Sequence, residues 1–157
     1  MAKPIPGSGI APVRWINDTK EVEEIYFQSS DKAITGRMYI GTTWQSNTYG
    51  IDGTETIPRQ GASISATVVE RMNSSMVLLA FVADDGWVSV QTRQTANVTN
   101  YGAFTSPIKL IEGNGQQTKL TAVRSSNRPT IILTGPKIIA MSSDNATTLN
   151  WTSNEIP

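Results

Sequence analysis

The chain has 157 residues, of which 38% are hydrophobic, and its 13 basic and 13 acidic residues give a formal net charge of zero. It contains no histidine and no cysteine, which argues against a Ser-His-Asp triad, a thiolate nucleophile and the usual zinc sites. No cluster of Lys and Arg stands out and no EF-hand spacing occurs, so the composition disfavours nucleic-acid and calcium binding.

The first part of the chain contains four short strand-like segments. An opening strand is predicted at Ile10–Arg14, and an apolar strand follows at Ile25–Gln28. Ser29–Lys32 has the residue types of a tight turn, and a third strand follows at Ile34–Tyr39. The fourth segment closes on an aromatic residue, Trp44.

The same four segments recur in the middle of the chain. The opening strand is Ile64–Val68, and the apolar strand is Leu79–Val82, at the end of the apolar run Met76–Val82. The latter run has no polar alternation, which is typical of a strand covered on both faces. A turn at Ala83–Gly86 leads to a third strand at Trp87–Thr92, and the closing aromatic is Tyr101.

A third copy occupies the C-terminal part. Its opening strand is Leu120–Arg124 and its apolar strand is Ile132–Thr134. The turn at Thr134–Lys137 contains Gly and Pro, and a third strand follows at Ile138–Met141. Trp151 closes this copy.

The spacing of the three copies predicts a repeat protein. Ile10, Ile64 and Leu120 are separated by 54 and 56 residues, and the other segments return with similar periods. Four short strands in roughly 40–50 residues are typical of a propeller blade. The predicted blades cover about residues 8–55, 60–110 and 115–157 of a single domain. The alternative is an ordinary β-sandwich with irregular strands.

Three blades do not close a propeller by themselves, because known rings contain about four to eight. The two uncovered blade faces are expected to drive association, and the chain stops just after the third closing aromatic. We therefore predict an all-β chain of three four-stranded blades that completes a six-bladed β-propeller by homodimerisation, since closed two-fold assemblies are the commonest oligomers.

The first copy resembles the fungal fucose-specific lectins. Gly9–Trp15, Ile25–Gln28, Ile34 and Trp44 are similar to that family's Ile-Ala-Ala strand ending in Trp, its Val-Tyr-Phe-Gln strand, its Ile-Arg-Glu strand and its closing Trp. The second and third copies look like degenerate versions. The resemblance implies a six-bladed propeller with sugar sites between the blades.

The resemblance also implies that fucose is held by an Arg just before the Tyr-Phe strand, a Glu in the next strand and a stacking aromatic. The Arg position is Glu24 in the first copy and Leu78 in the second. The Glu position is occupied by Gly36, Val90 and Ala140. Only the closing aromatics match the pattern, so the polar half of the fucose site is missing in all three copies.

The candidate ligand-binding residues are aromatics that can stack on a sugar ring and charged residues that can bind its hydroxyl groups. The aromatic candidates are Trp15, Trp44, Tyr101 and Trp151. The charged candidates are Arg14, Arg37, Arg124 and Glu24. The alternatives are core packing for the aromatics and ion pairs with Glu21, Glu23 or Glu24 for the arginines. No catalytic residue, metal ligand or cofactor is predicted.

Two functions from different classes fit these residues. The first is a lectin-like carbohydrate-binding protein whose ligand is a sugar or another small molecule, with no nucleic-acid or membrane partner. The second is a small-molecule enzyme, for example a cyclase of secondary metabolism, that works by positioning its substrate in one deep apolar pocket. A structural or effector interaction protein is a third option.

The N-terminus shows no hydrophobic region of a signal peptide, so we expect a soluble protein that is cytoplasmic or secreted without one.

Overall fold

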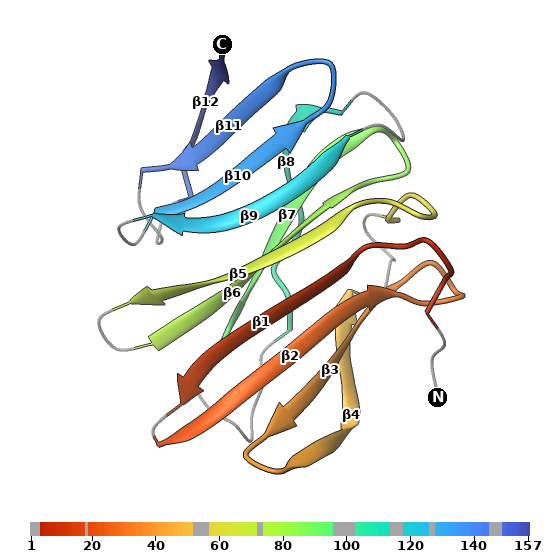
Figure 1. The fold of residues 1–157 in the computed structure, drawn as a ribbon, viewed down its shortest axis with the longest axis vertical. Helices are drawn as coiled ribbons and strands as arrows, with labels where there is room; N and C mark the ends of the chain where they lie inside the picture. Colours follow the sequence, from red (N-terminus) through yellow and green to blue (C-terminus); the bar gives the residue numbers. More distant parts are fainter. Residues whose placement is uncertain are drawn as a thin grey trace.

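The computed structural model of the chain describes residues 4–17, 19–51, 57–71, 74–95, 103–113, 118–125, 128–144 and 149–157. Within these ranges the chain forms three four-stranded antiparallel sheets (Figure 1). Blade 1 consists of β1 (Ile10–Asn17), β2 (Lys20–Gln28), β3 (Ile34–Ile40) and β4 (Thr43–Ile51). Blade 2 consists of β5 (Ile64–Arg71), β6 (Ser74–Val82), β7 (Trp87–Gln94) and β8 (Ile108–Glu112). Blade 3 consists of β9 (Lys119–Ser125), β10 (Arg128–Thr134), β11 (Ile138–Ser143) and β12 (Trp151–Ile156).

Each blade is an up-and-down meander, because every strand pairs with the next one along the chain. The blades follow one another in sequence order, with the opening strands β1, β5 and β9 side by side (Figure 1). Blade 2 therefore lies between the other two blades. The predicted all-β fold of three repeated four-stranded units is confirmed.

Strand pairing makes the three blades comparable residue by residue. In the first two strands of each blade, the matching pairs are Ile10–Phe27, Ile64–Phe81 and Leu120–Leu133. At the start of the third strands, the matching pairs are Gln28–Ile34, Val82–Val88 and Thr134–Ile138. Residues that hold the same place in these ladders are called equivalent below. The spacing of the sequence repeat thus corresponds to a shared register.

The hydrophobic core lies between the blades. Alternate residues of a strand point to opposite faces of its sheet. In β6, Val77, Leu79 and Phe81 are buried in a cluster with residues of blade 1, whereas Leu78 and Ala80 are buried in a cluster with residues of blade 3. Both faces of β6 are covered, which is the reason for the unbroken apolar run Met76–Val82.

The turn after β6 has the expected hairpin chemistry. The Gly86 N–H donates to the Ala83 carbonyl at 3.0 Å, and Gly86 has a φ of 92°. A side chain is strained at that φ, so glycine is favoured here. The turn returns the chain into β7 in the register that places Val88 opposite Val82.

Candidate functional site

The candidate binding regions are the seams between blades. The first seam lies between blades 1 and 2, and the second seam lies between blades 2 and 3. Blade 2 turns one face toward blade 1 and the other toward blade 3. The register assigns Ile10, Ile64 and Leu120 to the first kind of face, since Ile64 packs against blade 1 and Leu120 against blade 2.

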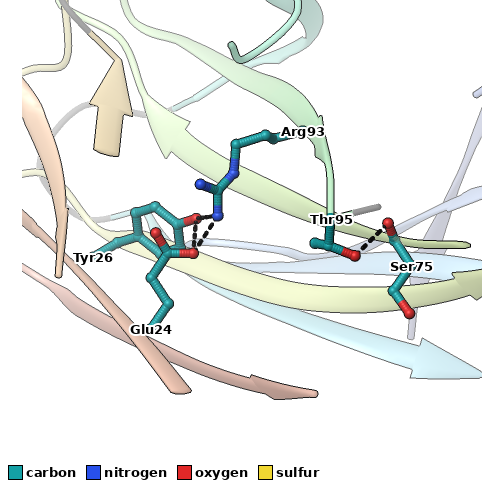
Figure 2. A network of polar contacts seen from close by, with 5 residues as sticks. All are labelled: Glu24, Tyr26, Ser75, Arg93 and Thr95. Atoms are coloured by element: carbon teal, nitrogen blue, oxygen red, sulfur yellow. Dashed lines mark hydrogen bonds and ion pairs between the residues drawn. The ribbon is translucent and has the colours of Figure 1, made fainter. Parts of the chain in front are cut away.

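A buried polar network occupies the first seam. Figure 2 shows Glu24 and Tyr26, from β2, directed toward Arg93 of β7. The Tyr26 hydroxyl donates to Glu24 Oε2 at 2.6 Å. Arg93 Nη2 forms an ion pair with the same oxygen and donates to the Tyr26 hydroxyl at 3.0 Å. The three residues are only 0%, 0% and 1% exposed, so blades 1 and 2 are joined by a charge pair that excludes solvent.

An aromatic ring extends this network. The Tyr26 and Phe104 rings meet edge to face, with centroids 5.9 Å apart. The Arg93 guanidinium also lies over Phe104, at 5.4 Å from the ring centroid. This arrangement provides a cation–π contact in addition to the ion pair.

Burial controls the protonation of the network. Burial raises the pKa of Glu24 above 4.5, although the positive charge of Arg93 and the hydrogen bonds from Tyr26 and Arg93 act in the opposite direction. Burial and the nearby Glu24 carboxylate raise the pKa of Tyr26 well above 10. Tyr26 therefore keeps its proton at neutral pH and remains a hydrogen-bond donor to Glu24.

Further polar atoms of the first seam are buried without a hydrogen-bond partner among the described residues. They are Trp15 Nε1, Glu24 Oε1, Ser89 Oγ and Gln91 Oε1. Each such atom lowers the free energy of unfolding by about 1–3 kcal/mol unless water or another molecule forms a hydrogen bond with it. The set contains both donors and acceptors, so it matches water or a hydroxyl-bearing group.

The second seam has different chemistry at equivalent places. Leu78 and Ala80 stand where blade 1 has Glu24 and Tyr26, and Ser143 stands where blade 2 has Arg93. At the rim of this seam, Thr118, Thr134 and Lys137 contribute to a pocket of about 60 Å³. That volume holds about two water molecules. This pocket is not the deep apolar cavity that a metabolite enzyme requires.

In the part of the chain that the structure describes, two blade faces have no neighbouring blade. The open face of blade 1 carries Ile10, Arg14, Ile16, Glu21, Glu23, Arg37, Tyr39 and Trp44. The open face of blade 3 carries Thr121, Val123, Arg128, Thr130, Ile138, Ser142, Thr152 and Ile156. Among the described residues, the exposed large apolar side chains lie on these faces, apart from Ile57 and Ile108.

An aromatic pair is accessible on the open face of blade 1. Trp44 pairs with Tyr39 across β3 and β4, and their ring centroids are 5.2 Å apart with planes inclined by 57°. Trp44 is 54% exposed. Trp151 takes the equivalent place in blade 3, where it pairs with Ser143 and packs half-buried in the second seam. Trp44 therefore holds a seam position that no other blade faces among the described residues.

The other predicted aromatic residues differ in their surroundings. Trp15 is 4% exposed and belongs to the buried cluster of the first seam. Tyr101 lies outside the described residues. Of the predicted aromatic set, Trp44 has the most accessible ring among those that the structure describes.

The predicted charged residues do not gather at one site. Arg14 forms an exposed ion pair with Glu21, as the alternative interpretation of this arginine expected. Arg37 is half-buried on the open face of blade 1, and Arg124 is exposed on blade 3. Glu24 does face an arginine across a seam, but this arginine is Arg93.

Sequence reasoning missed Arg93 and Tyr26. A signal was present, because Arg93 is the charged residue of the otherwise uncharged run Trp87–Gln94. Within the described ranges, no group of three or more acidic side chains gathers as a metal site, and no helix is long and apolar enough to cross a membrane.

Comparison with known proteins identifies the fold. No family model and no curated protein matches the chain. AofleA from Arthrobotrys oligospora is 13% identical with a TM-score of 0.70, over 99% of this chain and 45% of AofleA. The SapL1 lectin, solved with alpha methyl fucoside, is 15% identical with a TM-score of 0.70, over 97% of this chain and 48% of SapL1. The fucose-specific lectin from Aleuria aurantia is 18% identical with a TM-score of 0.64, over 98% of this chain and 50% of the lectin.

The chain thus spans about half the length of these structures. The resemblance seen in the sequence is confirmed at the level of the fold. The chain has the β-propeller fold of the fungal fucose-specific lectins, and its three blades match about half of one such chain.

Proposed function

We propose that the chain is a lectin-like carbohydrate-binding protein whose ligand stacks on the Trp44–Tyr39 pair. The observation that carries this proposal is the 54% exposure of Trp44 at a position equivalent to a seam aromatic. A flat apolar ring beside a polar handle suits a sugar, which has one apolar face and a rim of hydroxyl groups. The SapL1 lectin was solved with a fucoside, so the fold supports sugar binding in that protein.

The ligand preference is expected to differ from that of a fucose-specific site. The register aligns Glu24, Leu78 and Thr130 at the position of the family's Arg. It aligns Gly36, Val90 and Ala140 at the position of the family's Glu. No blade offers that Arg–Glu pair, so recognition is expected to depend on stacking and on neutral hydroxyl groups.

We also propose that a second copy of the chain completes the ring. Ile10 and Ile16 are 65% and 72% exposed on blade 1. At the place equivalent to Ile10, Ile64 of blade 2 and Leu120 of blade 3 are buried against the preceding blade. Ile138 and Ile156 are exposed on the opposite end, on blade 3. Covering both faces with copies of the same chain removes these side chains from water and gives a closed two-fold assembly.

Glycan-array screening, followed by titration of the best glycan with tryptophan fluorescence, tests the binding proposal. We expect at least one glycan class to bind, and we expect Trp44→Ala to weaken it by about tenfold or more. Trp87→Ala is the matched control, because Trp87 lies on blade 2 and stacks with Lys109 rather than on an open face. Methyl fucoside should bind no better than other methyl glycosides.

If no glycan on the array binds the protein even at high protein concentration, the lectin proposal is wrong. Equal losses in the Trp44→Ala and Trp87→Ala variants would place the ligand away from the open face.

The enzyme hypothesis has no supporting observation of its own. The pocket at the rim of the second seam is small, and the buried polar network in the first seam is closed to solvent.

A further inference from the structure

The two observed seams share one register along the opening strands. In the first seam, a Cβ placed on Gly9 would lie 2.7 Å from the Ile64 nitrogen. In the second seam, Ser63 Oγ accepts a hydrogen bond from the Leu120 nitrogen at 3.0 Å. Gly9 and Ser63 are equivalent, as are Ile64 and Leu120. Successive blades are therefore related by the same offset, and a third seam can be derived from it.

We propose that blade 3 of one chain packs on blade 1 of a second copy in this same offset, and that the seam forms a ligand site from both chains. This inference rests on the proposed ring of two chains, whose open faces lie on blades 1 and 3 at the two ends of the row (Figure 1). Two such seams close the ring, so each dimer holds two composite sites.

The shared offset assigns charged residues of both signs to the derived seam. Val22 of blade 1 and Val77 of blade 2 are both fully buried in the first seam. Their equivalents at the derived seam are Arg128 of blade 3 and Glu23 of the second copy. Both side chains are exposed in the single chain. Two buried apolar places of the first seam are thus held by residues of opposite charge at the derived seam, which fits a second copy as the occupant.

The same offset assembles the ligand site. At the place of Glu24 and Met38 in the first seam, blade 3 presents Thr130 and Ser142, whose hydroxyl oxygens are 3.0 Å apart. At the place of Arg93, the second copy presents Tyr39, with Trp44 beside it. One chain supplies the aromatic surface and the other supplies hydroxyl groups. A neutral, hydroxyl-rich ligand is the class that such a site favours.

Sedimentation tests the register without any ligand. We expect Glu23→Arg and Arg128→Glu each to raise the dissociation constant of the dimer by about tenfold or more, because like charges then meet. The double variant restores the opposite-charge pair and should return to within about threefold of the wild type. Lys109→Glu is the control. It reverses one charge of the exposed Lys109–Asp85 ion pair on blade 2, away from both open faces.

A monomeric wild type overturns the inference. So does a double variant that dissociates as readily as the single ones. Circular dichroism of each variant separates a lost interface from a lost fold.

Complementation tests the composite site with the glycan found by the array. Trp44→Ala alone should lose binding, as should Thr130→Val combined with Ser142→Ala. When the two variants are unfolded together and refolded, half of the dimers are mixed and each has one intact seam. Binding should then return to about a quarter of the wild-type sites.

Absence of any recovery in mixed dimers contradicts a site built from two chains. If the wild type dimerises with the predicted charge dependence but binds no glycan, the proposed function fails and the register stands.

Discussion

The two seams of the chain have the same backbone register and opposite chemistry. In the first, the buried Glu24, Tyr26 and Arg93 connect blades 1 and 2 by an ion pair and hydrogen bonds. In the second, the apolar side chains of Leu78 and Ala80 hold the equivalent places of Glu24 and Tyr26. The comparison teaches that the fold is defined by the strand order within each blade and by the offset between blades. The side chains at equivalent places of the two seams can therefore differ in polarity and charge. In the proposed ring of two chains, the open faces of blades 1 and 3 would form a further seam with its own side-chain chemistry.

The largest expected effect comes from breaking the ion pair of the first seam. Arg93→Ala leaves Glu24 buried without its charge partner, which typically costs about 3–5 kcal/mol of the free energy of unfolding. Urea unfolding monitored by circular dichroism measures this loss. A variant that unfolds within experimental error of the wild type would show that the network does not hold blades 1 and 2 together.

In the second seam, the free energy of unfolding should depend on apolar packing rather than on an ion pair. Leu78→Ala removes a fully buried side chain and is expected to lower the free energy of unfolding by about 2–5 kcal/mol. Ile57→Ala provides the matched control, because Ile57 is exposed and its truncation should cost about 0.5 kcal/mol or less. Similar losses in both variants, measured by urea unfolding, would contradict the observed burial.

The pH dependence of stability tests the first seam, because this seam contains the buried carboxyl group of Glu24. Because burial raises the pKa of Glu24, the folded chain holds this proton more tightly than the unfolded chain. The contribution of Glu24 to stability is therefore fully present below about pH 4.5 and is lost as the pH rises through the raised pKa. We expect the stability of the wild type relative to Glu24→Gln to fall over this range. A relative stability that rises with pH would mean that the carboxyl pKa is lowered.

The smallest expected effect comes from making the first seam resemble the second. Replacing both charged partners, Glu24→Leu with Arg93→Leu, should change the free energy of unfolding by only about 1 kcal/mol, because apolar packing can substitute for a buried ion pair. Urea unfolding of this double variant beside Arg93→Ala gives the comparison. A loss as large as that of Arg93→Ala would show that the first seam depends on its charges.

The repeated fold could be predicted from the sequence because its signal is local. Turn residues and apolar strands recur with a regular period, and the predicted anchors Ile34, Val88 and Ile138 occupy equivalent places in the ladders. The closing residues Trp44 and Trp151 are equivalent as well, since each pairs with the same position of the third strand.

The candidate site was less predictable because its contacts cross between blades. Glu24 and Arg93 are 69 residues apart and meet only once two sheets stack. Sequence spacing provides no reason to prefer Arg93 over Arg14, Arg37 and Arg124. It also does not separate the buried Trp15 from the exposed Trp44. A cytoplasmic or signal-independent secreted location stays a prediction, as do the exact domain boundaries.

The mass of the chain in solution tests the central claim most directly. Sedimentation equilibrium of the 157-residue chain should show one species of twice 17.0 kDa, because two copies cover both open faces and leave none for further growth. A single species of 17.0 kDa at every concentration would contradict the account, since the open faces of blades 1 and 3 would then remain in water.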